Sequence, residues 1–237
     1  MTTKTSTGAV GPAGFEDLQA LMALMTGDEK HDVAATSTLD ALWVLYDRVL
    51  RVSPDTAEAQ DRDRFLLSKG HGPMAYYAVL AAKGFIDPAV LPGFGGYDSP
   101  LGYHPDRTLL PGVEISSGSL GHGLPLAVGT TLGLRAQGLA DPAVWALVGD
   151  AEFDEGSNHE AVAFAGAYGL DRLNVVVIDN SSATHGWQGG IAQRFAVEGW
   201  STATVDGRDH EALLRAYTAE HPGRPHVVVA RVEPKYS

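Results

Sequence analysis

Short apolar runs and helix-spaced apolar positions alternate along the chain. Residues 144–148 and 174–178 are short apolar runs, and each ends in a polar turn. Between them, residues 155–168 carry small and apolar side chains at the spacing of a helix. A strand, a helix and a second parallel strand form the unit of a doubly wound sheet. The pattern therefore predicts an α/β fold, with a mostly parallel sheet and helices on both faces.

The same interpretation extends to the rest of the chain. We expect further strands at 64–68, 202–206 and 226–232, and helices at 15–25, 38–50, 73–83, 124–138 and 209–219. Residues 1–14 are rich in Thr, Gly and Ala and have little to bury, which predicts a flexible N-terminal arm. Neither an internal repeat nor a linker divides the remainder, so residues 15–237 are expected to form one domain.

Composition narrows the class of protein. The chain has 237 residues, of which 44% are hydrophobic, and its net charge is −12. This is enough for an α/β core, and the acidity disfavours nonspecific binding to nucleic acid or anionic membranes. The chain has no cysteine, which excludes disulfides and thiolate metal sites and agrees with a cytoplasmic location. No apolar run approaches the roughly 20 residues of a transmembrane helix, so we expect no membrane partner.

Oxygen-bearing side chains follow both central runs. Asp150 comes directly after the first run, and Asn180 follows the second. A carboxylate and an amide carbonyl suit Mg²⁺, which usually completes its coordination with water and ligand phosphates. The helix expected after Asp150 turns backbone N–H groups toward the same place, which favours an anion. The pair therefore fits a metal-bridged diphosphate, although Asp and Asn are also common turn residues at strand ends.

The whole stretch around these two residues is more specific. It resembles the thiamine diphosphate motif of transketolase-like enzymes, which has GDG, EG, EA, AG…L and then DN. The corresponding residues here are Gly149-Asp150-Ala151, Glu155-Gly156, Glu160-Ala161, Ala165-Gly166 with Leu170, and Asp179-Asn180. The resemblance implies the diphosphate-binding (PP-type) module of the thiamine diphosphate fold. It also implies that Mg²⁺ (or Ca²⁺ or Mn²⁺) is held by Asp150, the Asn180 side chain and the Ser182 backbone carbonyl.

One position departs from that motif. Ala151 stands where the family usually has glycine, close to the expected diphosphate. Whether its methyl group is tolerated there depends on the backbone φ.

Three other segments resemble transketolases. Residues 63–71 read DRFLLSKGH, which implies that His71 reaches the cofactor diphosphate. Gly102-Tyr103-His104-Pro105 resembles a GHP segment, with Tyr in place of Gly, and implies that His104 contacts the donor substrate. The SSGSLGHG run that ends at Gly123 resembles a TG-x-LG-x-G segment. Its backbone, at Gly118 and Leu120, is then expected against the aminopyrimidine of the cofactor.

His31 and Glu155 have two interpretations each. His31 precedes Tyr46 by the spacing found in N-terminal subunits of split transketolases, but the SGH-x-GG motif of those subunits is absent here. A substrate role and an ordinary loop histidine therefore both remain open. Glu155 and Glu160 lie near a helix N-terminus, where carboxylates favour the helix dipole. In the family, these positions lie at the interface between subunits and link the two cofactors.

The resemblance spans residues 36–232 and implies a two-component enzyme. What matches is the diphosphate-binding half of a transketolase. The pyrimidine-binding half, with the glutamate that starts ylide formation, and the later segment carrying a further histidine are not found in this sequence. We therefore expect a separate pyrimidine-binding (C-terminal) partner chain, in an α2β2 heterotetramer.

The expected reaction is transfer of a two-carbon ketol unit from a ketose to an aldehyde through thiamine diphosphate. Two alternatives remain open. One is another thiamine diphosphate activity on a sugar or 2-oxo acid, such as a 2-oxo acid decarboxylase or dehydrogenase or a deoxyxylulose-phosphate-synthase-like enzyme. The other is a non-catalytic partner that has kept the fold.

Overall fold

Five parallel strands form one sheet in the computed structural model, which describes residues 13–26, 36–70 and 72–235. The strand order is β1-β2-β3-β5-β4. The strands are β1 (Arg64–Leu67), β2 (Val144–Gly149), β3 (Leu173–Asp179), β4 (Ser201–Asp206) and β5 (His226–Arg231). Each corresponds to a run predicted from the sequence. The expected N-terminal arm lies almost wholly outside the described residues.

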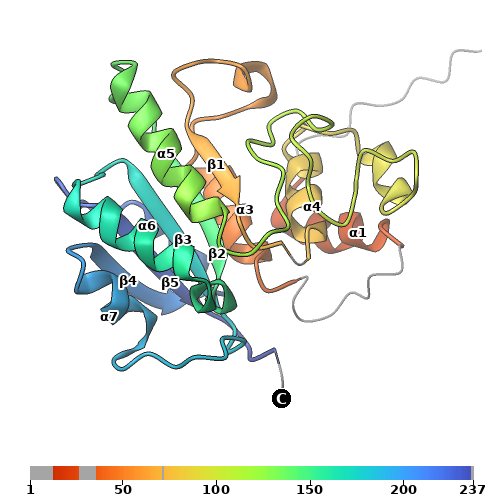
Figure 1. Cartoon of the computed structure of the whole chain (residues 1–237). Helices are drawn as coiled ribbons and strands as arrows, with labels where there is room; N and C mark the ends of the chain where they lie inside the picture. Colours follow the sequence, from red (N-terminus) through yellow and green to blue (C-terminus); the bar gives the residue numbers. More distant parts are fainter. Residues whose placement is uncertain (1–12, 27–35, 71, 236–237) are drawn as a thin grey trace, which may run out of the picture.

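Helices cover both faces of the sheet, as Figure 1 shows. The α-helices are α1 (Leu18–Ala23), α3 (Leu39–Arg48), α4 (Met74–Ala82), α5 (Gly123–Ala136), α6 (Gly156–Ala167), α7 (Gly190–Ala196) and α8 (His210–Tyr217). The side chains of β2 alternate between two apolar clusters: Val144, Ala146 and Val148 pack with α5, α6 and α7, whereas Trp145 and Leu147 pack with α1, α3, α4 and α8. The predicted doubly wound α/β fold is confirmed.

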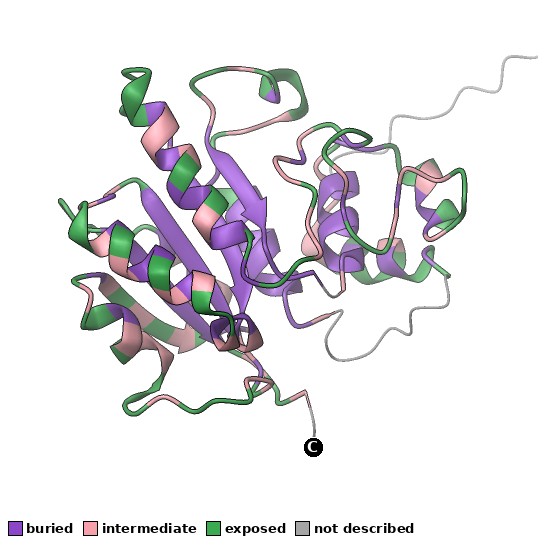
Figure 2. Ribbon diagram, viewed as in Figure 1, coloured by how far each residue is buried: buried purple, intermediate pink, exposed green. Residues whose placement is uncertain are grey.

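Burial along the strands follows their position in the sheet. Strands β1 and β2 are buried at every position, and β3 and β5 at all but their last residue, because they have neighbours on both sides or helices on both faces. Edge strand β4 alternates between half-buried and exposed residues. In Figure 2 the centre of the sheet is purple, whereas the helices on its outer side have mixed colours because one face of each is exposed.

Four short helices differ from the sequence-based expectations. Helix α7 was not expected, because it has seven residues and only Phe195 is buried, too short a pattern for helical periodicity. Three 3₁₀ helices were also not expected. Two of them are η2 (Pro54–Thr56) and η3 (Pro88–Gly93). The other is η4 (Asp150–Asp154), which separates Asp150 from the start of α6.

All five strands end at the same edge of the sheet, which we call the carboxyl edge, and begin at the opposite, amino edge. Gly149 at the end of β2 is in register with Ile178 near the end of β3, so the segments that follow these two strands start side by side. Helices α5 and α6 begin at the carboxyl edge and run back to the amino edge. No helix in the described part of the chain is long and apolar enough to cross a membrane.

Candidate functional site

The structure places Asp150 and Asn180 at the carboxyl edge, directly after β2 and β3. Both residues are buried, with exposed fractions of 1% and 2%. The Asn180 backbone carbonyl accepts a hydrogen bond from the Lys235 amide (2.8 Å). The Asn180 side-chain oxygen is buried and has no hydrogen-bond partner within the described residues. A buried oxygen without a partner is costly, so this atom is a candidate ligand for a group that binds here.

The Asp150 carboxylate holds the segment that follows Asn180. It accepts hydrogen bonds from the Ser182 amide (2.7 Å), the Ser182 hydroxyl (2.5 Å) and the Ala183 amide (3.3 Å), besides its own neighbour's amide at Ala151 (2.8 Å). Ser181 makes the turn with a positive φ of 56°, the only such residue other than glycine in the described chain. The structure therefore brings Ser182 onto the Asp150 carboxylate and places Asn180 two residues before it, whereas a metal ligand at the Ser182 carbonyl stays a prediction.

The donor set at this point fits a hard cation. No group of three or more His, Asp or Glu side chains converges on a possible metal position within the described residues. A cation here would instead use mixed oxygen ligands, namely the Asp150 carboxylate and the free Asn180 oxygen, which is the donor chemistry of Mg²⁺. Ala151 raises no conformational objection, because its φ is not positive and a methyl group is accommodated on that backbone.

A second acidic group, which the sequence interpretation missed, joins three loops of the site. Glu152 is 1% exposed. Its Oε1 accepts hydrogen bonds from the Ser68 hydroxyl (2.6 Å) and the Gly121 amide (3.1 Å), and its Oε2 accepts one from the Gly149 amide (2.9 Å). Burial raises the pKa of this carboxyl, and the hydrogen bonds and the charge of Lys69 oppose the rise. No local sequence signal distinguishes Glu152 from an ordinary acidic residue in a helical first turn.

His104 meets two glycines from other loops. Its Nδ1 lies 2.8 Å from the Gly70 carbonyl oxygen, and because a carbonyl only accepts, Nδ1 carries the proton. A Cβ on Gly118 would lie 2.9 Å from the His104 ring, and one on Gly70 would lie 2.9 Å from the Gly118 Cα. Only glycine fits at these two positions. The structure thus brings the predicted residues His104 and Gly118 together beside the loop that follows β1.

The other predicted residues are distributed around this centre. His71 and His31 lie outside the described residues, so their predicted roles stay predictions. Leu120 is 37% exposed, and the neighbouring Gly121 carbonyl accepts a hydrogen bond from the Ser157 hydroxyl at the start of α6 (2.8 Å). Glu155 is exposed and immediately precedes α6.

A third carboxylate fastens the loop that follows β3. Asp154 accepts hydrogen bonds from the amides of Thr184 (2.8 Å) and His185 (3.1 Å). Partial burial alone would raise the pKa of Asp154, but these hydrogen bonds outweigh it and hold the pKa below its usual range. The backbone amides of residues 182–185 therefore all donate to Asp150 or Asp154.

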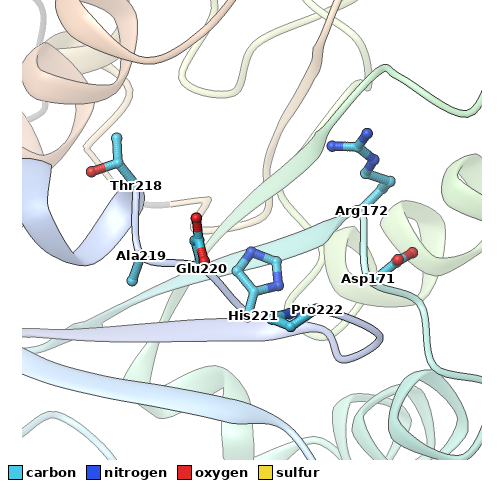
Figure 3. A pocket seen from close by; sticks show the side chains of 7 residues that line it. All are labelled: Asp171, Arg172, Thr218, Ala219, Glu220, His221 and Pro222. Atoms are coloured by element: carbon cyan, nitrogen blue, oxygen red, sulfur yellow. The ribbon is translucent and has the colours of Figure 1, made fainter.

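A cavity of about 360 Å³ lies away from this site. Figure 3 shows its lining, which comes from the residues before β3 and from the segment between α8 and β5: Asp171, Arg172, Thr218, Ala219, Glu220, His221 and Pro222. Both segments belong to the amino edge. None of the residues predicted for the functional site lines this cavity, so it is separate from that site.

The fold and the candidate site together define the class of doubly wound α/β proteins, which bind ligands at the carboxyl ends of their strands. The family described as "Transketolase, thiamine diphosphate binding domain" matches residues 18–232. The chain belongs to this family.

Among curated relatives, "Ferredoxin fas2" of Rhodococcoides fascians is 57% identical over 92% of this chain and 72% of its own length. One subunit of the apulose-4-phosphate transketolase of Actinobacillus succinogenes is 35% identical over 84% of this chain and 75% of its own length. This chain has no cysteine, so it lacks the thiolate ligands that hold the iron–sulfur cluster of a ferredoxin.

Whole transketolases match over a smaller share of their length. The "Transketolase" of Rhodobacter capsulatus is 31% identical over 89% of this chain but only 33% of its own length. Among solved structures, "Transketolase from Leishmania mexicana" superposes with a TM-score of 0.74 and 25% identity, covering 92% of this chain and 36% of that one. The chain thus spans about a third of these whole transketolases and about three quarters of the apulose-4-phosphate transketolase component.

Proposed function

We propose that this chain is the diphosphate-binding subunit of a two-component, transketolase-like enzyme, which transfers a ketol unit from a ketose donor to an aldehyde acceptor. The observation that carries the proposal is the position of two buried groups directly after adjacent strands: the Asp150 carboxylate and the Asn180 side-chain oxygen, which has no hydrogen-bond partner within the described residues. Relatives of similar extent that are named as one component of a transketolase support the two-component organisation.

In this proposal, Asp150, the Asn180 side chain and the Ser182 carbonyl hold Mg²⁺, and the cation fixes the diphosphate of thiamine diphosphate. The Asp150 carboxylate already accepts four hydrogen bonds, about as many as its lone pairs allow, so the cation takes the place of at least one of them. When bound, thiamine diphosphate supplies the carbon nucleophile that carries the two-carbon unit.

His104 is proposed to orient the donor substrate. Its protonated Nδ1 donates to the Gly70 carbonyl, which leaves Nε2 as an acceptor in the neutral ring. An acceptor at that position binds a sugar hydroxyl group. His71 is proposed to donate to the diphosphate, as the resemblance implies.

The partner is proposed to cover the outer face of α5 and α6. This face has unusually large exposed apolar side chains, among them Leu126 (48%), Phe164 (37%) and Tyr168 (59%), and the last two rings stack at 4.1 Å. Figure 2 shows how much of both helices is exposed on this side. Glu155 immediately precedes α6, and Glu160 lies on α6 one turn before Phe164. A pyrimidine-binding chain docked on this face is proposed to complete the site, in an α2β2 assembly.

The test is cofactor binding by this chain together with the pyrimidine-binding chain of the same organism. Titration calorimetry with thiamine diphosphate and Mg²⁺ is expected to show metal-dependent binding that Asp150→Ala abolishes. Asp171→Ala, at the amino edge, is the matched control and is expected to bind as the wild type does. Unchanged affinity in Asp150→Ala would refute the proposed site. Product analysis with ketose phosphates and with pyruvate then separates ketol transfer from 2-oxo acid chemistry.

A further inference from the structure

Glu152 lies beneath the candidate site rather than in it. It is not one of the motif positions that carry the resemblance, and its side chain is almost completely buried, together with that of Ser68. A carboxylate removed from water is costly unless its oxygens are fully hydrogen-bonded. Here the two oxygens accept three hydrogen bonds, all from segments that are distant in sequence from one another.

Those three segments are the ones that surround the expected cofactor. Ser68 directly follows β1 and precedes by three residues His71, which the resemblance implies reaches the diphosphate. Gly121 belongs to the loop that the resemblance places against the aminopyrimidine. Gly149 directly precedes Asp150, which the proposed function makes a metal ligand. One carboxylate therefore fixes the spacing of three cofactor-binding segments.

The contact continues into helix α5. The amide of Gly123, the first residue of α5, donates to the Ser68 oxygen (3.0 Å), and the Ser68 hydroxyl donates to Glu152. A Cβ at Gly123 would lie only 2.2 Å from the Ser68 Cβ, so the helix start packs directly on the end of β1. Gly123 thus donates to Ser68 and Ser68 to the Glu152 carboxylate, which ties the close-packed start of α5 to the same acceptor.

We propose that Glu152 is a positioning residue of the enzyme, which sets the distance between the loops after β1, before α5 and after β2 so that they bind thiamine diphosphate together. The proposal rests on the proposed function in that these loops are taken to be the cofactor site. The requirement is for two acceptor oxygens. Glutamine has the same shape but offers one acceptor, and its NH₂ group would face either the Gly149 amide or the Ser68 and Gly121 donors.

The experiment compares Glu152→Gln with Glu220→Gln in the assembled two-chain enzyme. Glu220 is an exposed glutamate of the amino-edge cavity (Figure 3), so its variant makes the same chemical change away from the site. Glu152→Gln is expected to raise the Kd of thiamine diphosphate by about 10- to 100-fold, the usual effect of losing a group that holds the direct ligands of a metal site in place. At saturating cofactor, kcat is expected to stay within about threefold of wild type, because no group that touches substrate has changed.

A second readout needs no cofactor. Hydrogen exchange of the Gly121 and Gly149 amides is expected to accelerate in Glu152→Gln and to stay unchanged in Glu220→Gln. If Glu152→Gln fails to fold, Ser68→Ala takes its place, and it is expected to weaken cofactor binding severalfold while the fold is kept.

The outcomes distinguish this proposal from the proposed function. If wild type binds the cofactor and the folded Glu152→Gln (or Ser68→Ala) variant binds it equally well, the positioning role is overturned and the proposed function stands. If wild type itself binds no cofactor, the proposed function and the role of Glu152 toward that cofactor fail together. Faster exchange would then mark Glu152 as a purely structural residue.

Discussion

Several loops at the two edges of the sheet are held by different kinds of hydrogen bond. At the carboxyl edge, carboxylates accept hydrogen bonds from backbone amides: Asp150 from Ser182, Glu152 from Gly121 and Gly149, and Asp154 from Thr184 and His185. At the amino edge, arginines donate to backbone carbonyls: Arg51 to Asp141 (2.9 Å), Arg172 to Ala140 (2.9 Å) and Arg135 to Gly169 (3.1 Å).

The direction of the helices is one reason for the difference. Helices α5 and α6 begin at the carboxyl edge, where helix starts leave amides without partners, and end at the amino edge, where carbonyls are left over. The carboxyl edge combines acidic oxygens suited to a cation with amides suited to an anion, as a metal-bound diphosphate requires.

The largest expected effect is at the start of α5. Gly123→Ala forces a Cβ to within 2.2 Å of the Ser68 Cβ and 2.7 Å of its Cα, so the end of β1 or the helix must move. We expect a loss of about 3 kcal/mol in the free energy of unfolding, measured with urea. Gly133→Ala is the control on the same helix, where a Cβ meets nothing within 4 Å, and a gain of about 0.5–1 kcal/mol is expected. Equal stabilities would show that the carboxyl edge is not packed as described.

The next effect tests whether buried carboxylates at the two edges differ in role. Asp63, which is 4% exposed at the amino edge, accepts the amides of Arg51 (2.9 Å) and Ala143 (2.8 Å) and pairs with the Arg51 guanidinium (3.0 Å). Asp63→Ala leaves buried donors unpaired, so unfolding is expected to become easier by about 2 kcal/mol. Cofactor affinity of the folded assembly should not change. If Asp63→Ala raised the Kd of the cofactor as much as Glu152→Gln does, the buried carboxylates at the two edges would not differ in role.

A pH effect is expected from His226, the first residue of β5. Burial lowers the pKa of His226 to about 4, so the folded protein holds it neutral while the unfolded chain titrates near its ordinary value. Its contribution to stability is complete above the unfolded pKa, near 6.5, and is lost as the pH falls toward 4. The slope reaches at most about 1.4 kcal/mol per pH unit.

The check for His226 is urea unfolding at several pH values. His226→Gln keeps a donor for the Ala216 carbonyl (3.1 Å) but cannot be protonated. The variant should flatten the pH dependence between 6.5 and 4. If the variant keeps the wild-type pH dependence, groups other than His226 cause that dependence.

The smallest effect on stability is expected at Asp154. Asp154→Asn weakens the hydrogen bonds to the Thr184 and His185 amides, at a cost of less than about 0.5 kcal/mol in global stability because the loop is at the surface. Amide exchange at these two residues should nonetheless speed up. In wild type, these hydrogen bonds are fully present at pH values above the ordinary pKa of a carboxyl group. They are lost as the pH falls through the lowered pKa of Asp154. Asp171→Asn is the control, and equal exchange in both variants would contradict the anchoring role.

Local patterns predicted the fold well, because its central strands β2, β3 and β5 are short runs rich in apolar residues. The run 174–178 is buried at every position within β3, and Asp150 and Asn180 could be placed at one edge because parallel strands share their direction. Helix α7 could not be predicted, since only Phe195 among its seven residues is buried. Glu152 could not be found either, because its partners Ser68, Gly121 and Gly149 become neighbours only in the folded chain.

The most direct test of the metal–diphosphate site is a crystal structure of the assembled pair with thiamine diphosphate and Mn²⁺, which has an anomalous signal. The account predicts one anomalous peak within ligand distance, about 2.2 Å, of the Asp150 carboxylate and the Asn180 side-chain oxygen, with the diphosphate bound to the same ion. An anomalous peak elsewhere, with Asp150 still bound only to the amides and hydroxyl of its own chain, would contradict it.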